Sequence, residues 1–83
     1  MSKILVEKKD LVHGEYYFGD CRNADTARWD ANRNKFYYWR NKFGQRFVED
    51  INHFEDDNGF DLFYPEHVVD YGVNKIPLRD DFA

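Results

Sequence analysis

A chain of 83 residues has the size of one small domain, and its 19% aromatic content supplies the large rings that a short chain needs for a core. The single cysteine, Cys21, excludes an intrachain disulfide and favours a reducing compartment, so we expect a cytoplasmic protein. No stretch approaches about 18 apolar residues and the first ten residues contain no apolar run, which predicts neither a membrane span nor a signal peptide.

The net charge of −4 is unevenly distributed along the chain. Residues 1–21 carry −1, residues 22–46 carry +5 and residues 47–83 carry −8. Such segregation indicates a charged partner surface, unless pairing between strands of the two segments interleaves the charges and cancels the field.

Short segments rich in aromatic and β-branched residues alternate with turn residues, which predicts strands joined by turns. The expected strands are 15–21, 26–30, 35–40, 45–51 and 60–64. Asn58 and Gly59 predict a hairpin, with an acidic patch at its tip formed by Glu55, Asp56 and Asp57. The segment 64–69 then predicts a short 3₁₀ turn followed by a final strand.

These elements predict an all-β fold, and five strands in so short a chain favour a small closed barrel because closure removes exposed strand edges. We expect an N-terminal segment over residues 1–10, a single barrel domain over 11–74, and a loosely ordered acidic tail over 75–83.

The strand order resembles that of a Src-homology-3-like barrel, over Leu11 to Tyr71. The resemblance includes a turn with proline and a valine pair near the end, Pro65-Glu66-His67-Val68-Val69. The acidic-aromatic motif that opens the peptide-binding members is missing, so the resemblance implies the barrel rather than polyproline recognition. The size and acidity also resemble those of small phage- or prophage-encoded proteins.

No residue pattern predicts a metal site, a cofactor or an active site. The soft metal ligands lack the paired spacing of zinc sites; they are His13, His53, His67 and Cys21. The acidic run at 55–61 does not place ligands as a calcium loop requires. A glycine-rich phosphate loop is absent and Ser2 is the only serine. A lone cysteine in a strand is more typical of a core than of a nucleophile paired with a histidine base. We therefore expect a protein that is not an enzyme.

Rings and cations alternate between residues 16 and 47, which hold ten of the sixteen aromatic residues. Four consecutive aromatics, 36–39, cannot all face one side of a strand. Either Phe36 and Tyr38 or Tyr37 and Trp39 should therefore point outward beside the cations. The predicted binding residues are Tyr17, Arg22, Arg28, Tyr37, Trp39, Arg40 and Lys42.

A surface of this kind suits a protein interface, where Trp, Tyr and Arg supply most of the binding energy. We expect a protein partner, as for a phage-type inhibitor of a host protein. Three alternatives remain open at this point. The same surface could stack single-stranded nucleic acid or a nucleotide, the acidic half could mimic nucleic acid, or the outer rings could pack against the N-terminal segment or the tail.

Overall fold

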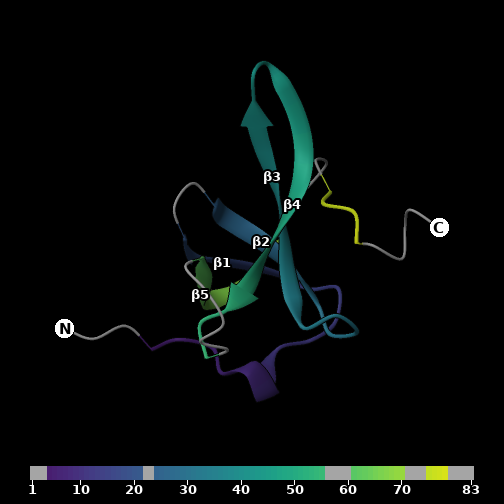
Figure 1. The fold of residues 1–83 in the computed structure, drawn as a ribbon. Coiled ribbons are helices and arrows are strands. Elements are labelled where there is room, and N and C mark those ends of the chain that lie inside the picture. The colour runs from purple at the N-terminus through teal and green to yellow at the C-terminus, as the bar shows by residue number, and fades with distance from the viewer. Residues whose placement is uncertain (1–3, 22–23, 56–60, 71–74, 79–83) are drawn as a thin grey trace.

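The computed structural model describes residues 4–21, 24–55, 61–70 and 75–78, and five strands dominate them (Figure 1). The described chain is therefore all-β, as its sequence pattern predicted. A 3₁₀ helix at Lys8–Asp10 comes first, and the strands follow as β1 (Tyr16–Cys21), β2 (Ala24–Asp30), β3 (Lys35–Lys42), β4 (Gln45–His53) and β5 (Leu62–Val69).

The strands form one sheet in the order β1-β2-β3-β4-β5, and β5 returns to pair with β1. Neighbours are antiparallel except for β4 and β5, which run parallel where Asn52 pairs with Leu62 and His53 with Phe63. The pairing of β5 with β1 is longer and antiparallel, from Tyr16 opposite Val69 to Asp20 opposite Tyr64. The last strand is thus held mainly by the first one.

The hairpin predicted from Asn58 and Gly59 is wrong, because a hairpin joins antiparallel neighbours and β4 and β5 are parallel. The long-range pairing of β5 with β1 outweighs the local turn signal. Residues 56–60 lie outside the described part of the chain, so Asp56 and Asp57 are not placed. Glu55 is placed and exposed.

Of the short 3₁₀ turn and final strand expected over 64–69, the strand is confirmed and the turn is wrong, because the whole segment belongs to β5. Pro65 lies opposite Gly19, where the register between β1 and β5 shifts. Proline has no backbone N–H to donate to the neighbouring strand, and strands tolerate it where the regular pairing is interrupted. The carbonyl of Pro65 accepts a hydrogen bond of 2.7 Å from the N–H of Val6, so the N-terminal segment lies along β5.

The core is a cluster of rings packed around Phe36, which is fully buried. Its ring lies 4.7 Å from both Trp29 and Phe63, measured between centroids, and Tyr17 meets it edge-on at 6.0 Å. Cys21 is buried in this cluster, as expected of a lone cysteine in a strand.

His53 is a fully buried polar residue at the end of β4. Its Nδ1 accepts a hydrogen bond from the N–H of Glu55, so the ring proton lies on Nε2, which faces the carbonyl oxygen of Val6 at 3.3 Å. The neutral ring therefore ties the N-terminal segment to the end of β4.

We predict that Gly19→Ala destabilises the protein strongly, because a Cβ at this position would lie 2.5 Å from both Phe63 Cζ and the carbonyl oxygen of Tyr64. Forcing an extra methyl into a packed site costs about 3 kcal/mol. Chemical denaturation should show this loss. Gly44→Ala is the matched control, since a Cβ there meets nothing within 4 Å. Its positive φ costs about 1 kcal/mol. Equal losses in both variants would contradict the close approach at Gly19.

Candidate binding surface

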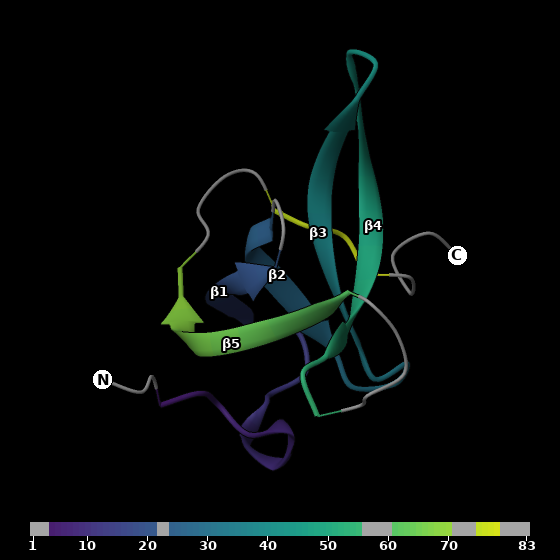
Figure 2. The same cartoon turned by 60° about the vertical axis from the view of Figure 1, so that its left-hand side comes forward.

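Strands β3 and β4 form a long hairpin that projects from the rest of the sheet (Figures 1 and 2). Its turn consists of Phe43 and Gly44, both with positive φ, at 52° and 77°. Positive φ at both central residues is typical of a type I′ turn, whose twist matches that of the flanking strands. β2 pairs with β3 only as far as Tyr37, so among the described strands β4 is the only neighbour of the outer half of β3.

The hairpin tip, residues 41–46, combines an exposed ring with cations. The side chain of Phe43 is 93% exposed. Lys42 Nζ lies 5.6 Å from the centre of its ring. The Arg46 guanidinium lies 4.3 Å from the centre of the Trp39 ring. No aspartate or glutamate occurs between residues 31 and 48, so the tip is cationic on an acidic protein.

Below the tip, two side chains on one face of the hairpin share a carboxylate oxygen of a third. The hydroxyl of Tyr38 and Nη1 of Arg40 both donate hydrogen bonds to Oε2 of Glu49. Burial, followed by the hydrogen bond to Glu49, raises the pKa of Tyr38 to about 12. The hydrogen bond from Tyr38 is the main cause that lowers the pKa of Glu49 below its usual value. This network stiffens the hairpin and holds Arg40 on a carboxylate of its own chain.

The opposite face of the hairpin is covered at its base by the C-terminal segment. Ile76 and Leu78 are buried against Tyr37, and Trp39 and Val48 pack against this cluster. The alternative that outer rings pack against the tail is therefore confirmed for Tyr37. The loosely ordered tail stays a prediction for residues 79–83, which lie outside the described ranges.

Two predicted binding residues are not on the surface, which corrects the sequence-based anchor. Tyr17 is 1% exposed and lies in the main core, and Tyr37 is 2% exposed beneath the C-terminal segment. Of the four consecutive rings, Tyr37 and Trp39 lie outside the main core cluster that holds Phe36 and Tyr38, as one of the two expected arrangements requires, but the expected exposure of Tyr37 is wrong because this ring is buried. The two faces of β3 are each covered by a different part of the chain.

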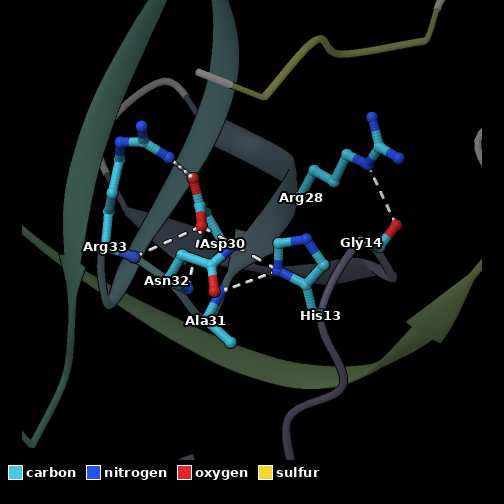
Figure 3. A network of polar contacts seen from close by, with 7 residues as sticks. All are labelled: His13, Gly14, Arg28, Asp30, Ala31, Asn32 and Arg33. Atoms are coloured by element: carbon cyan, nitrogen blue, oxygen red, sulfur yellow. Dashed lines mark hydrogen bonds and ion pairs between the residues drawn. The ribbon is translucent and has the colours of Figure 1, made fainter. Parts of the chain in front are cut away.

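Arg28, another predicted binding residue, holds backbone in place. Its Nε donates to the carbonyl oxygen of Gly14 at 3.0 Å, as Figure 3 shows, and its Nη1 donates to that of Ile76 at 2.8 Å. The Tyr16 hydroxyl accepts a hydrogen bond of 3.0 Å from the N–H of Ile76. Arg28 and Tyr16 together therefore clamp the C-terminal segment. Arg22 lies outside the described residues.

The turn before β3 is fixed by the fully buried carboxylate of Asp30 (Figure 3). It accepts hydrogen bonds from the N–H groups of Asn32 and Arg33, at 3.0 and 3.3 Å, and from the guanidinium of Arg33. His13 Nδ1 accepts from the N–H of Ala31 at 3.1 Å, so it carries no proton. Its 3.9 Å separation from Asp30 Oδ1 is therefore not an ion pair. The network sets where β3 starts and how the hairpin leaves the sheet.

The structure keeps Trp39, Arg40 and Lys42 of the predicted set on the hairpin, with Trp39 and Arg40 half-buried and Lys42 exposed. It adds Phe43 and Arg46, which the sequence-based set missed. A glycine between two alternating segments was the available signal, because it marks a two-residue turn whose first residue, Phe43, must then be exposed. Within the described ranges, no group of three His, Cys, Asp or Glu side chains could hold a metal ion.

We predict that Glu49→Gln lowers the pKa of Tyr38 from about 12 but leaves it above 10, because burial is the largest cause of the shift. Ultraviolet absorbance of tyrosinate measures this titration, and Tyr38→Phe identifies the signal. In the unchanged protein the neutral phenol stabilises the fold fully below pH 10, and this stabilisation is lost as the pH rises from 10 to about 12. Titration of Tyr38 near pH 10 in the unchanged protein would contradict its burial.

No protein-family model, curated protein or solved structure matches the chain. None of the described residues belongs to a helix long and apolar enough to cross a bilayer. The candidate surface is therefore defined by its own geometry, which places an exposed ring and two exposed cations at the end of a projecting hairpin.

Proposed function

We propose that the protein is a non-catalytic binding module that recognises a protein partner through the tip of its β3–β4 hairpin. The exposure of Phe43, 93%, is the observation that carries this proposal. Burying one such ring contributes about 1.5–3 kcal/mol. The turn geometry defines the backbone that carries the ring at the apex, which limits the backbone entropy lost when the ring enters a pocket.

The partner surface is an apolar pocket with carboxylates at its rim. Lys42 lies beside the Phe43 ring and Arg46 over the Trp39 ring, and both cations are exposed, whereas Arg40 is already bonded to Glu49. Cations at the rim of an interface speed association and select against basic partners more than they add affinity. A phage-type inhibitor that occupies an acidic cleft of a host protein in the cytoplasm fits this character.

A protein partner is favoured over single-stranded nucleic acid by the burial of the rings. A nucleic-acid platform needs several exposed rings in succession. Here Tyr17, Tyr37 and Tyr38 are buried, and one side of the Trp39 ring is covered by Arg46. Mimicry of nucleic acid by the acidic half remains a hypothesis, since most of the acidic run at 55–61 lies outside the described residues.

We further propose that the scaffold is a small Src-homology-3-like barrel. Five short strands whose pairing order returns to the first strand support this assignment. β4 and β5 are parallel and share two residue pairs, so β5 is held mainly by its longer pairing with β1. The barrel supplies a rigid base, and the hairpin carries the binding residues away from it.

We predict that Phe43→Ala weakens partner binding by about 2 kcal/mol, or roughly 30-fold in Kd, because it removes the central apolar anchor. A pull-down with the tagged protein, with and without nuclease, identifies the partner, and calorimetry then measures Kd. Stability should change by less than about 0.5 kcal/mol, because the ring touches little of its own chain. Unchanged affinity of a folded Phe43→Ala variant would refute the hairpin as the binding element.

We predict that Lys42→Glu slows association with the partner, most strongly at low salt, because it reverses a charge at the rim of the interface. Lys9→Glu is the matched control, since Lys9 is an exposed cation on the N-terminal 3₁₀ helix, outside the hairpin. Stopped-flow measurements at two ionic strengths compare the variants. Equal effects of the two changes would mean that only net charge matters, which would contradict a specific role for the tip.

A further inference from the structure

The outer face of β1 and β5 is a second surface that exposes rings. Side chains alternate along β1, so Phe18 and Asp20 point outward while Tyr17 and Gly19 are buried. Phe18 is 39% exposed and stacks on His67 with 5.3 Å between ring centroids. Tyr64, opposite Asp20 in the pairing, is 41% exposed. We refer to these four outward residues as the β1–β5 face. Monomeric proteins seldom leave neighbouring rings exposed without a use for them.

A hollow next to this face combines apolar walls with carboxylates. It is lined by Leu5, Asp20, Tyr64 and Glu66. A long cationic side chain suits such a hollow, because its stem packs on apolar groups while its charged end meets a carboxylate. The occupant of the β1–β5 face should therefore present a cation and an apolar ring close together.

The hairpin tip has this chemistry, with Lys42, Phe43 and Arg46 within five consecutive residues. The tip cannot reach the β1–β5 face of its own molecule, because the hairpin projects upward, away from β5, and β5 lies in the lower half of the protein in both views (Figures 1 and 2). The complementary element must come from another molecule.

We propose that the β1–β5 face receives the hairpin tip of a second copy of this chain, so that the protein associates head to tail. Lys42 or Arg46 enters the hollow towards Asp20, and the Phe43 ring packs against Tyr64 and Phe18. The contact joins two different surfaces, so repeated contacts close into a ring or extend as a chain. Association is weak, because a hairpin tip offers much less than the roughly 1,600 Å² of a standard interface.

This inference rests on the same tip as the proposed function, and it adds a form of regulation. A tip that occupies the β1–β5 face of a neighbour is not available to a foreign partner. High local concentration of the protein should therefore reduce partner binding, and dilution should release the tip.

Sedimentation equilibrium of the full chain tests the proposal at protein concentrations from about 10 μM to 1 mM. The measurements are made at about 50 and 500 mM NaCl, because the electrostatic screening length differs about threefold between these two salt concentrations. We expect the average mass to rise with concentration at low salt and to fall back towards one chain at high salt. Two charge-reversed variants, Lys42→Glu with Arg46→Glu and Asp20→Lys with Glu66→Lys, should each remain monomeric. Their equimolar mixture should associate again, because each variant keeps the surface that the other has lost.

Circular dichroism checks that the variants fold. If the variant Asp20→Lys with Glu66→Lys is not folded, the single change Asp20→Asn replaces it. The interface is small, so its association needs a high protein concentration. Wild-type protein that stays monomeric at about 1 mM in low salt, the highest concentration measured, would overturn the proposal. Concentration-dependent association that persists in each of the two charge-reversed variants would also overturn the proposal.

The proposed function is tested separately by the variant with the reversed β1–β5 face, whose hairpin is native. Retained capture of the lysate partner by this variant, with loss of self-association, is the expected result. A different result would overturn self-association: the wild type is monomeric, the Asp20→Lys with Glu66→Lys variant no longer captures the lysate partner, and the Lys42→Glu with Arg46→Glu variant still does. This result would assign the β1–β5 face to a basic foreign protein. Both proposals are supported together if the tip variant loses partner capture as well as self-association, while the variant with the reversed face loses self-association alone.

Discussion

The position of one ring, that of Phe36, governs how the five strands come together. It contacts one ring from each of the other strands, with Tyr17 on β1, Trp29 on β2, His53 on β4 and Phe63 on β5. A ring shared by all strands fixes their spacing, because close-packed interiors tolerate little change in volume. Since Phe36 lies at the start of β3, the base of the hairpin is the best-anchored part of that strand, and its tip is the freest.

The two faces of the hairpin base are held by different means, and together they make the hairpin a rigid support for its tip. The main core covers Phe36 and Tyr38, and the C-terminal segment covers Tyr37. That segment is itself held by hydrogen bonds from Arg28 and with Tyr16. Binding residues on such a support lose little freedom when they engage a partner, which favours affinity.

The charge segregation of the sequence is cancelled at the base of the hairpin but persists at its tip. Arg40 is bonded to Glu49 on the neighbouring strand, and Arg33, in the turn before β3, is bonded to Asp30 at the end of β2. Lys42 and Arg46 lie nearer the apex of the hairpin than Glu49, the first acidic residue of β4, and each has an aromatic ring beside it. After strand pairing, the hairpin tip is therefore cationic on a protein with a net charge of −4. The β1–β5 face, which includes Asp20 and has Glu66 beside it in the hollow, lies away from the apex of the hairpin (Figure 1).

The sequence by itself determined that the chain is all-β and roughly where β1 to β4 lie, because alternation of side chains and turn residues act over a few neighbouring residues. Only the tertiary structure decided which rings are exposed. Tyr37 follows the alternation that would place it outward, yet Ile76 covers it from nearly forty positions away. Likewise, β5 pairs with β1 across most of the chain and not in the hairpin that Asn58 and Gly59 favoured. Such contacts depend on which distant segments bury the most apolar surface together, and no local pattern contains that information.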